Sequence, residues 1–307
     1  MKRIIVSGSL AYDRIMNFSD KFSDHILPDK IHNINVCFQV DGVTENFGGT
    51  AGNIAYALRL LGERPLISAT IGHDYHNYFN WFDQHEIAKE GIKIVPDEFT
   101  AGAYITTDAG NNQITGFNPG AMKYSSELDV NLLSPEDDLL LVSPGNLSDM
   151  IHYPRLCKTK DINYIFDPGQ SLPMLEAEDL RHVIENCLIL TVNDYEFNMI
   201  QEKTKLSREE LLQLPQSCII TLGELGSVIY SGGRTHRIPA CKAAAVIDPT
   251  GAGDAFRGGL VSGLLHGKDI VDSARQGSAI ASFAVESAGT QVYSCTLDEY
   301  RSRLASI

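Results

Sequence analysis

Short runs rich in Ile, Val and Leu alternate with stretches of helical spacing along most of this 307-residue chain. Such alternation is typical of a mainly parallel sheet that helices cover on both faces. The runs end where polar or glycine residues begin, and α/β proteins bind ligands at the carboxyl ends of such strands. The pattern predicts an α/β fold with strands at Ile4–Ser7, Leu66–Ile71, Leu139–Val142, Tyr164–Phe166, Leu188–Leu190 and Cys218–Thr221.

Helical spacing is clearest between Thr50 and Leu61, and Gly62 follows as a helix stop. The last third of the chain is also predicted to be helical. There are no internal repeats, low-complexity tracts or long linkers. We therefore expect residues 1–307 to form a single domain, with its late helices at Gly253–Leu265, Ile270–Ser287 and Leu297–Ala305.

Two segments, at about 14–47 and about 101–118, break the alternation. The second contains two β-rich runs around Gly110-Asn111-Asn112, which is typical of a hairpin turn. We expect the two segments to form a small inserted β-layer that serves as a lid, although an edge extension of the main sheet would show the same pattern. The first segment has apolar residues with period-2 spacing in places, at Phe18, Ile34, Val36, Phe38, Val40 and Val43.

The chain carries 25 basic and 39 acidic residues, which gives a net charge of −14. This acidity argues against nucleic-acid and anionic-membrane partners, because both select clustered Lys and Arg. No apolar run approaches the roughly 20 residues of a membrane-spanning helix. The six cysteines are scattered without a C-x-x-C pair, so we expect reduced thiols and a cytoplasmic protein.

Several common catalytic motifs are missing from the sequence. It has no G-x-x-x-x-G-K-[ST] phosphate loop, and its glycines do not fit the G-x-G-x-x-G dinucleotide fingerprint. Neither H-E-x-x-H nor G-x-S-x-G occurs. A metalloprotease or a serine hydrolase therefore has little support.

The segment from Asp248 to Gly259 begins a predicted helix and combines glycines with two acids. Backbone amides at a helix start can bind an anion, and the helix dipole adds partial positive charge there. An acid beside such amides suits phosphoryl transfer to a hydroxyl group. A Gly-rich helix start with an acid near it is the plain structural alternative. A helix N-terminus would also make the acid a weaker base, by stabilising its charged form.

This segment resembles the second signature of the ribokinase-like (PfkB) carbohydrate and nucleoside kinases, D-[TP]-x-G-A-G-D-x-F-x-x-G. The resemblance implies a three-layer α/β/α architecture with a small β-sheet lid. It also implies that Asp254 is the catalytic base and that the amides of Gly251, Ala252 and Gly253 form the anion hole.

Two early clusters are similar to the acceptor-binding motifs of the same family. Gly48-Gly49-Thr50-Ala51-Gly52-Asn53 matches the first signature, G-G-x-x-x-N, in which the Gly pair and the Asn hold the sugar. Asp13 follows the first strand and matches an Asp that binds sugar hydroxyls. By themselves, these residues would also suit a loop-to-helix junction and a strand-terminating turn.

Two later clusters are similar to the family's nucleotide-binding motifs. Asn193-Asp194-Tyr195-Glu196 resembles N-x-x-E, which implies that Asn193 and Glu196 help to place Mg²⁺ and phosphate, with Glu196 acting through water. The same residues would also make a helix capping box. Thr221, Gly223 and Gly226 resemble the family's [TK]-x-G-x-x-G loop along ATP, and an ordinary hairpin would look the same.

Two further positions carry weaker implications from the resemblance. Ser278 falls near where many relatives have an Asn beside the adenine, and this departure weakens a base contact there. A K⁺ ion near Asp248 is compatible with the family, although the sequence shows no ligand set for it.

The segments around Asp13, His25–Lys30 and Thr106–Met122 resemble the bacterial adenosine and nucleoside kinase branch. This implies ATP-dependent phosphorylation of a nucleoside, adenosine foremost, at its ribose 5′-hydroxyl. A sugar kinase of ribokinase or fructokinase type is the alternative, and a non-catalytic ligand-binding protein is a third reading. Pairing into a homodimer through the lid is left open. Candidate contacts to a nucleobase are Phe38, Phe117, Met122 and Gln113.

Overall fold

A computed structural model describes residues 3–33 and 35–307. Within these residues, nine strands form one sheet in the order β13-β12-β11-β10-β9-β8-β1-β4-β5. Pairing is parallel from β5 to β11, and β12 and β13 add antiparallel strands at one edge. The six predicted strands are confirmed. The nine are β1 Arg3–Ser7, β4 Leu66–Gly72, β5 Ile92–Val95, β8 Asp138–Val142, β9 Asn163–Phe166, β10 Ile189–Asn193, β11 Ser217–Thr221, β12 Ser227–Ser231 and β13 Arg234–Ile238.

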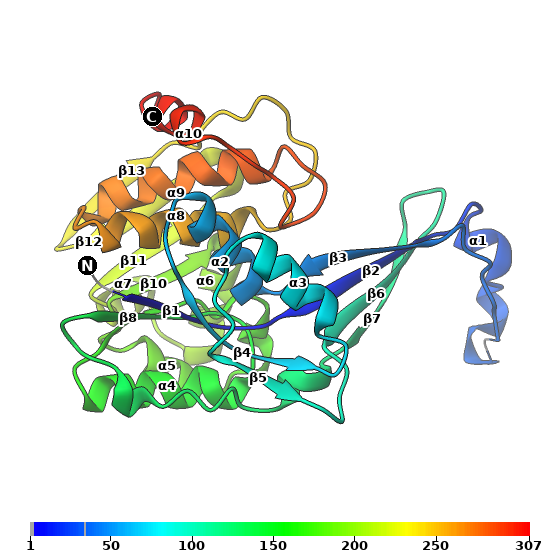
Figure 1. Cartoon of the computed structure of the whole chain (residues 1–307), viewed down its shortest axis with the longest axis horizontal. Coiled ribbons are helices and arrows are strands. Elements are labelled where there is room, and N and C mark those ends of the chain that lie inside the picture. The colour runs from blue at the N-terminus through cyan, green and yellow to red at the C-terminus, as the bar shows by residue number, and fades with distance from the viewer. Residues whose placement is uncertain (1–2, 34) are drawn as a thin grey trace.

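Helices cover both faces of this sheet (Figure 1), which confirms the three-layer architecture. Alternate side chains of β1 point to opposite faces of the sheet, where two separate hydrophobic cores lie. Ile4 and Val6 pack in one core, and Ile5 packs in the other. One face carries α2 Thr50–Leu60, α3 His76–Gln84, α8 Ala252–Leu265 and α9 Ile270–Ala284, with α10 Leu297–Leu304 packed against α9. The other carries α4 Leu147–Thr159, α5 Ala177–Ile184, α6 Asp194–Thr204 and α7 Arg208–Gln213.

The predicted late helices are present, although α9 ends at Ala284, before the expected Ser287. Helices α8 and α9 approach closely because glycines face the neighbouring backbone. A Cβ on Gly259 would lie 2.6 Å from the carbonyl oxygen of Gln276. This contact holds the helix that begins at the Gly-rich segment.

A second, smaller sheet projects from the main body (Figure 1). Its strand order is β3-β2-β6-β7, and β6 and β7 form the predicted hairpin, with Asn111 in the turn at φ 59°. Because none of these strands pairs with the nine-stranded sheet, the small sheet is not an edge extension of it. Its strands are β2 Ala11–Asn17, β3 Val43–Gly48, β6 Ala101–Thr107 and β7 Gln113–Asn118.

The period-2 pattern before Val43 does not form a strand. Residues 18–33 hold a short helix, α1 Phe22–His25, and a 3₁₀ turn, Pro28–Asn33, while residues 35–42 are irregular. Phe18, Phe22 and Phe38 pack together in a local aromatic cluster, with ring centroids 4.8–5.9 Å apart. Of the six predicted positions, Phe18 and Phe38 therefore pack in this cluster, and Val43 begins strand β3. Ile34 lies outside the described residues.

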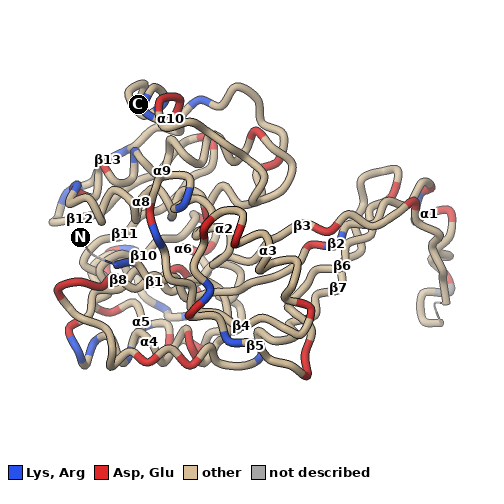
Figure 2. Tube along the Cα trace, viewed as in Figure 1, with Lys and Arg blue, Asp and Glu red and all other residues tan. Residues whose placement is uncertain are grey.

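Lys and Arg are scattered among Asp and Glu along the trace (Figure 2). In the part of the chain that the structure describes, no helix has both the length and the apolar character needed to cross a membrane.

Candidate active site

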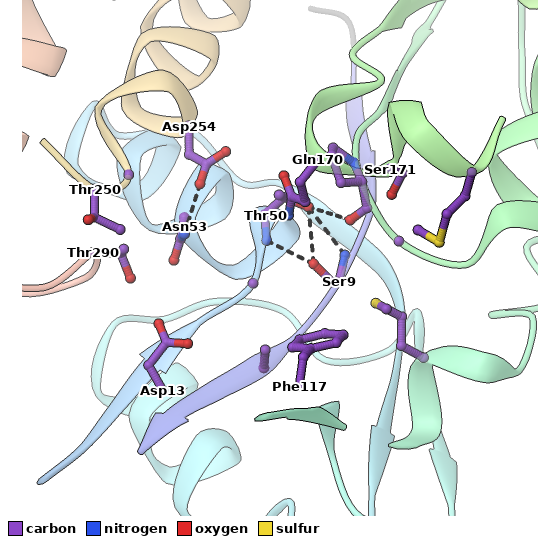
Figure 3. Close-up of a pocket in the computed structure, with 17 residues that line it drawn as sticks. Ser9, Asp13, Thr50, Asn53, Phe117, Gln170, Ser171, Thr250, Asp254 and Thr290 are labelled. Atoms are coloured by element: carbon purple, nitrogen blue, oxygen red, sulfur yellow. Dashed lines mark hydrogen bonds between the residues drawn. The ribbon is translucent and has the colours of Figure 1, made fainter. Parts of the chain in front are cut away.

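A cleft of about 460 Å³ opens between the small sheet and the carboxyl ends of the central strands (Figure 3). Seven residues singled out from the sequence line it: Asp13, Gly49, Asn53, Phe117, Met122, Gly251 and Asp254. Four others, Ser9, Ala11, Thr50 and Thr250, belong to the segments around Asp13, Gly48–Asn53 and Asp248–Gly259 that the sequence analysis singled out. Sequence reasoning missed the remaining six, because only the fold brings them to the cleft: Pro144, Gly145, Gln170, Ser171, Met174 and Thr290.

Asp254 stands in the first turn of α8, one turn from the N-cap Gly251. Gly251 has φ +79°, a conformation that L side chains rarely adopt, and a Cβ there would lie 3.0 Å from Thr290. The Asp254 carboxylate accepts a 2.8 Å hydrogen bond from Asn53 Nδ2 (Figure 3). The arrangement places an acid and a helix N-terminus on the same wall of the cleft.

Burial raises the pKa of Asp254 above its ordinary value. The positive charge of Arg257 and the hydrogen bond from Asn53 both oppose this rise. The expected weakening of the base is therefore wrong in direction, because desolvation outweighs the lowering of the pKa by Arg257 and Asn53. A carboxylate with a raised pKa accepts a proton more readily.

Arg257 and Asp167 form a buried ion pair beneath Asp254 that sequence reasoning missed. Arg257 Nη2 donates to Asp167 Oδ1 at 2.8 Å, and Arg257 Nε also contacts Asp167 Oδ2. Burial raises the pKa of Asp167 to about 7 against the pull of Arg257, and the nearby charges of Glu196 and Asp254 add to the rise. Asp167 directly follows β9, so a carboxylate at a strand end was the available signal.

The glycines of the first cluster allow a close approach between two loops. Gly49 has φ +85° at the start of α2, and a Cβ there would lie 2.5 Å from the carbonyl oxygen of Ser9. A Cβ on Gly48 would lie 2.8 Å from Asp13 Oδ2. Burial raises the pKa of Asp13. Asp13 and Asn53 thus border one space, which fits recognition of neighbouring hydroxyls.

Thr50 links three loops around this space, as Figure 3 shows in part. Its Oγ1 donates to the carbonyl oxygen of Pro144 at 2.7 Å, and its N–H donates to Ser9 Oγ at 3.1 Å. Because these groups are buried, the bonds hold the start of α2 firmly against β1 and β8.

The two predicted nucleotide-binding clusters lie side by side at the carboxyl ends of the neighbouring strands β10 and β11, because Asn193 and Thr221 are register partners. The capping box is confirmed: Asn193 Oδ1 accepts from Glu196 N at 2.7 Å, and Glu196 Oε2 accepts from Asn193 N at 2.8 Å. The hairpin is confirmed too, because Gly223 and Gly226 form the turn between antiparallel β11 and β12. Neither cluster lines the cleft.

Gly48, Ala252 and Gly253 are not among the residues that line the cleft, and three further predicted contacts also lie away from it. Phe38 belongs to the aromatic cluster at α1, and Gln113 is exposed on β7, where its Nε2 lies 3.3 Å from Thr107 Oγ1. Ser278 is buried, and its Oγ donates to Pro239 O at 3.0 Å while accepting from Cys241 N at 2.9 Å. Through these bonds, Ser278 joins α9 to the segment that follows β13. Its role beside the adenine stays a prediction.

Asp248 holds the loop before α8 by accepting hydrogen bonds from Thr250 N at 2.9 Å and Gly289 N at 3.1 Å. Burial favours a higher pKa for Asp248, but these bonds outweigh it and lower the pKa. Among the described residues, no three His, Cys, Asp or Glu side chains converge to hold a metal ion.

Comparisons with known proteins agree with this geometry. A family model described as pfkB family carbohydrate kinase matches residues 6–296. A nucleoside kinase of Methanocaldococcus jannaschii is 32% identical and covers 99% of this chain and 97% of its own length. The ligand-free structure of a Burkholderia thailandensis nucleoside kinase is 40% identical, with a TM-score of 0.88 over 98% of this chain and 99% of that one. Its complex with inosine is 39% identical, with a TM-score of 0.85 over 99% and 97% of the two chains.

Proposed function

This chain belongs to the pfkB family of carbohydrate kinases, and we propose that it transfers the γ-phosphoryl group of ATP to the ribose 5′-hydroxyl of a nucleoside. As a member of that family it is a phosphotransferase that acts on a hydroxyl group. One observation carries the proposal: Asp254, the N-cap Gly251 and the acceptor-side residues Asp13 and Asn53 all line one cleft.

The chemistry needs an ionised acid and an anion-binding backbone. The acceptor hydroxyl oxygen bonds to the γ-phosphorus, the bond to the β–γ bridging oxygen breaks, and ADP leaves. Asp254 orients the hydroxyl and takes its proton late in the transfer. The amides of Gly251, Ala252 and Gly253 stabilise the negative charge on the moving phosphoryl group.

The cleft has room for a base beyond the ribose. Asp13 would accept hydrogen bonds from ribose hydroxyls, because an ionised carboxylate only accepts. Phe117 from the small sheet, with Met122 and Met174, supplies an apolar wall, and Gln170 offers both a donor and an acceptor. Adenosine is the leading acceptor. The B. thailandensis relative, whose structure was solved with inosine, supports a purine nucleoside.

Mg²⁺ would be held mainly by ATP phosphates and water, with Glu196 as an outer ligand. Only one carboxylate oxygen of Glu196 serves the capping box, so the other suits a water ligand. The ion would neutralise phosphate charge. The proposal also includes a K⁺ ion near Asp248 and a cytoplasmic location. It further includes closure of the small sheet as a lid and pairing of two chains through that sheet.

The decisive experiment measures kcat/KM with ATP for adenosine, inosine, cytidine, ribose and fructose. We expect the purine nucleosides to exceed the free sugars by at least about tenfold, because the base adds buried apolar area. A preference for ribose or fructose would overturn the nucleoside proposal in favour of a sugar kinase. Binding of nucleosides without transfer to any acceptor would instead indicate a ligand-binding protein.

A further inference from the structure

We infer that Gln291 is a positioning residue that holds Asn53, and through it Asp254, in one orientation. The inference rests on the proposed role of Asp254 as the base. Gln291 Nε2 donates to Asn53 Oδ1 at 3.0 Å, and Asn53 Nδ2 donates to Asp254 Oδ2 at 2.8 Å. On its other side, Gln291 Oε1 accepts from Trp81 Nε1 at 3.0 Å.

The direction of these bonds follows from the chemistry of Trp81. An indole N–H can only donate, so the group of Gln291 that faces it must be the carbonyl oxygen. This fixes the Gln291 amide, whose nitrogen then faces Asn53. Asn53 must in turn present its oxygen to Gln291 and its N–H to Asp254. We call the path from Trp81 through Gln291 and Asn53 to Asp254 the amide relay.

Tyr78 strengthens the same orientation. Gln291 Nε2 also donates to Tyr78 Oη at 2.8 Å, and Tyr78 Oη donates its own proton to the carbonyl oxygen of Gly48 at 2.6 Å. Both amide hydrogens of Gln291 are therefore used, and a flipped amide would set its carbonyl oxygen against two acceptors. Gly48 also belongs to the Gly48–Asn53 cluster, so the relay ties this cluster to Asp254.

Burial makes the relay costly to disturb. Gln291 is 1% exposed, Tyr78 is 0% exposed and Asn53 is 6% exposed. A buried polar group that loses its partner forfeits both the bond and its hydration. If Gln291 stopped donating, Asn53 would be free to turn its amide oxygen toward the Asp254 carboxylate, which would repel it.

The relay also bears on the charge of Asp254. The titratable and charged groups around this carboxylate are Arg257 on its own helix, Asp167 after β9, Tyr78 on α3 and Tyr293 beyond α9. Asn53 is the side chain that donates to Asp254 in this setting, and its bond lowers the pKa of Asp254. Loss of the relay should therefore move the titration of the base to higher pH.

The sequence provides a reporter, because Trp81 is the one tryptophan in the chain. A ¹H–¹⁵N spectrum of the ¹⁵N-labelled full-length protein should show a single indole cross-peak. In the wild type we expect the position of this peak to change with pH. The midpoint of that change should equal the midpoint of the acid limb of the kcat/KM profile. In Asp254→Asn the shift with pH should vanish while the peak remains.

Kinetics of Gln291→Met complete the test. We expect kcat to fall on the order of 10–100-fold, as small misplacements of a catalytic group do, with the KM for ATP unchanged. The acid limb should also move to higher pH. Trp81→Phe removes the indole N–H but keeps both N–H donors of Gln291. We therefore expect kcat and the acid limb to change in the same direction as in Gln291→Met, but by less. Tyr56→Phe is the matched control, because Tyr56 packs against Trp81 and its buried hydroxyl donates to the backbone oxygen of Tyr293 and not to the relay.

A wild-type indole peak that stays still through the acid limb would overturn the inference. So would a Gln291→Met protein with wild-type kcat and pH profile. Failure of the proposed function looks different, since the wild type would then transfer phosphate to no nucleoside or sugar. The indole titration would still report in that case whether the relay senses Asp254.

Discussion

Asn53 Nδ2 lies 2.8 Å from Asp254 Oδ2, although the two residues are 201 positions apart in the chain. The bond joins the first turns of α2 and α8. Asn53 also belongs to the segment that begins with Gly48 and Gly49, whose backbone borders Asp13. The Gly48–Asn53 segment and Asp254 are therefore fixed to one another, and in their proposed roles this lowers the cost of orienting the acceptor hydroxyl.

Replacing Asp254 by Asn should remove the proton acceptor and keep the fold. An Asn at 254 preserves the shape of the side chain, and Arg257 stays paired with Asp167. We expect kcat to fall by about 10²–10⁴-fold, the usual contribution of a general base. Steady-state kinetics and a thermal melt would check this, and near-normal turnover in a folded variant would contradict the role of Asp254.

The pH dependence should carry the signature of a buried carboxylate. Because burial raises the pKa of Asp254, kcat/KM should rise with pH through a midpoint above 3.8, the ordinary value for Asp. Between the ordinary and the raised pKa, the folded state binds more protons than the unfolded state, so this group lowers stability as pH rises through that window. Urea unfolding of wild type and Asp254→Asn at several pH values would measure the difference. A steeper fall in the variant would contradict the raised pKa.

The ion pair beneath the base should be needed for stability. Asp167 and Arg257 are 1% and 9% exposed, so removing one partner leaves a buried charge. We expect Asp167→Leu to lower the free energy of unfolding by about 3–5 kcal/mol. The double variant Asp167→Leu/Arg257→Met should recover much of this loss, because no unpaired charge remains. Chemical denaturation of the two single variants and the double variant measures the coupling, and simple additivity would show that the pair does not act as a unit.

Much of the main fold was predictable because its signals are local. Each strand is a short apolar run that ends at a glycine or polar residue. In β1, alternate side chains pack into the hydrophobic cores on opposite faces of the sheet. The spacing of Phe18 and Phe38 did not indicate a strand, because these two side chains pack on one another in an aromatic cluster. Nothing in a local pattern distinguishes side chains that pack on one another from side chains that face a sheet.

The position of Gly251 and Asp254 on one cleft wall was predictable, because a single motif contains both the helix start and the acid. Gln291, Tyr78 and Asp167 could not be found in this way, because each acts through a partner far away in sequence. Their side chains are also common in ordinary cores and turns. Gln113 was a candidate by its chemistry alone, and the fold leaves it exposed outside the cleft.

Phe117 offers a test of base recognition that leaves the phosphoryl-transfer residues untouched. It lines the cleft from β7 and is 56% exposed, so its replacement creates no cavity in a core. We expect Phe117→Ala to raise the KM for adenosine by up to about tenfold, the worth of one aromatic contact. The kcat should change little, and the KM for ATP should be unchanged. An equal rise in KM for free ribose would show that Phe117 shapes the cleft without contacting the base.

Gly49 should be irreplaceable for a reason that combines backbone conformation and space. Its φ of +85° is strained for any L side chain, and an added Cβ would lie 2.5 Å from the carbonyl oxygen of Ser9. Gly49→Ala should lower the free energy of unfolding by more than about 1 kcal/mol and raise the KM for the acceptor. Gly116→Ala is the matched control, since the φ of Gly116 is not in the positive range and no atom of the described residues lies within 4 Å of the added Cβ. Equal stability of the two variants would show that the loop around Ser9 yields, so that the close approach at Gly49 is not required.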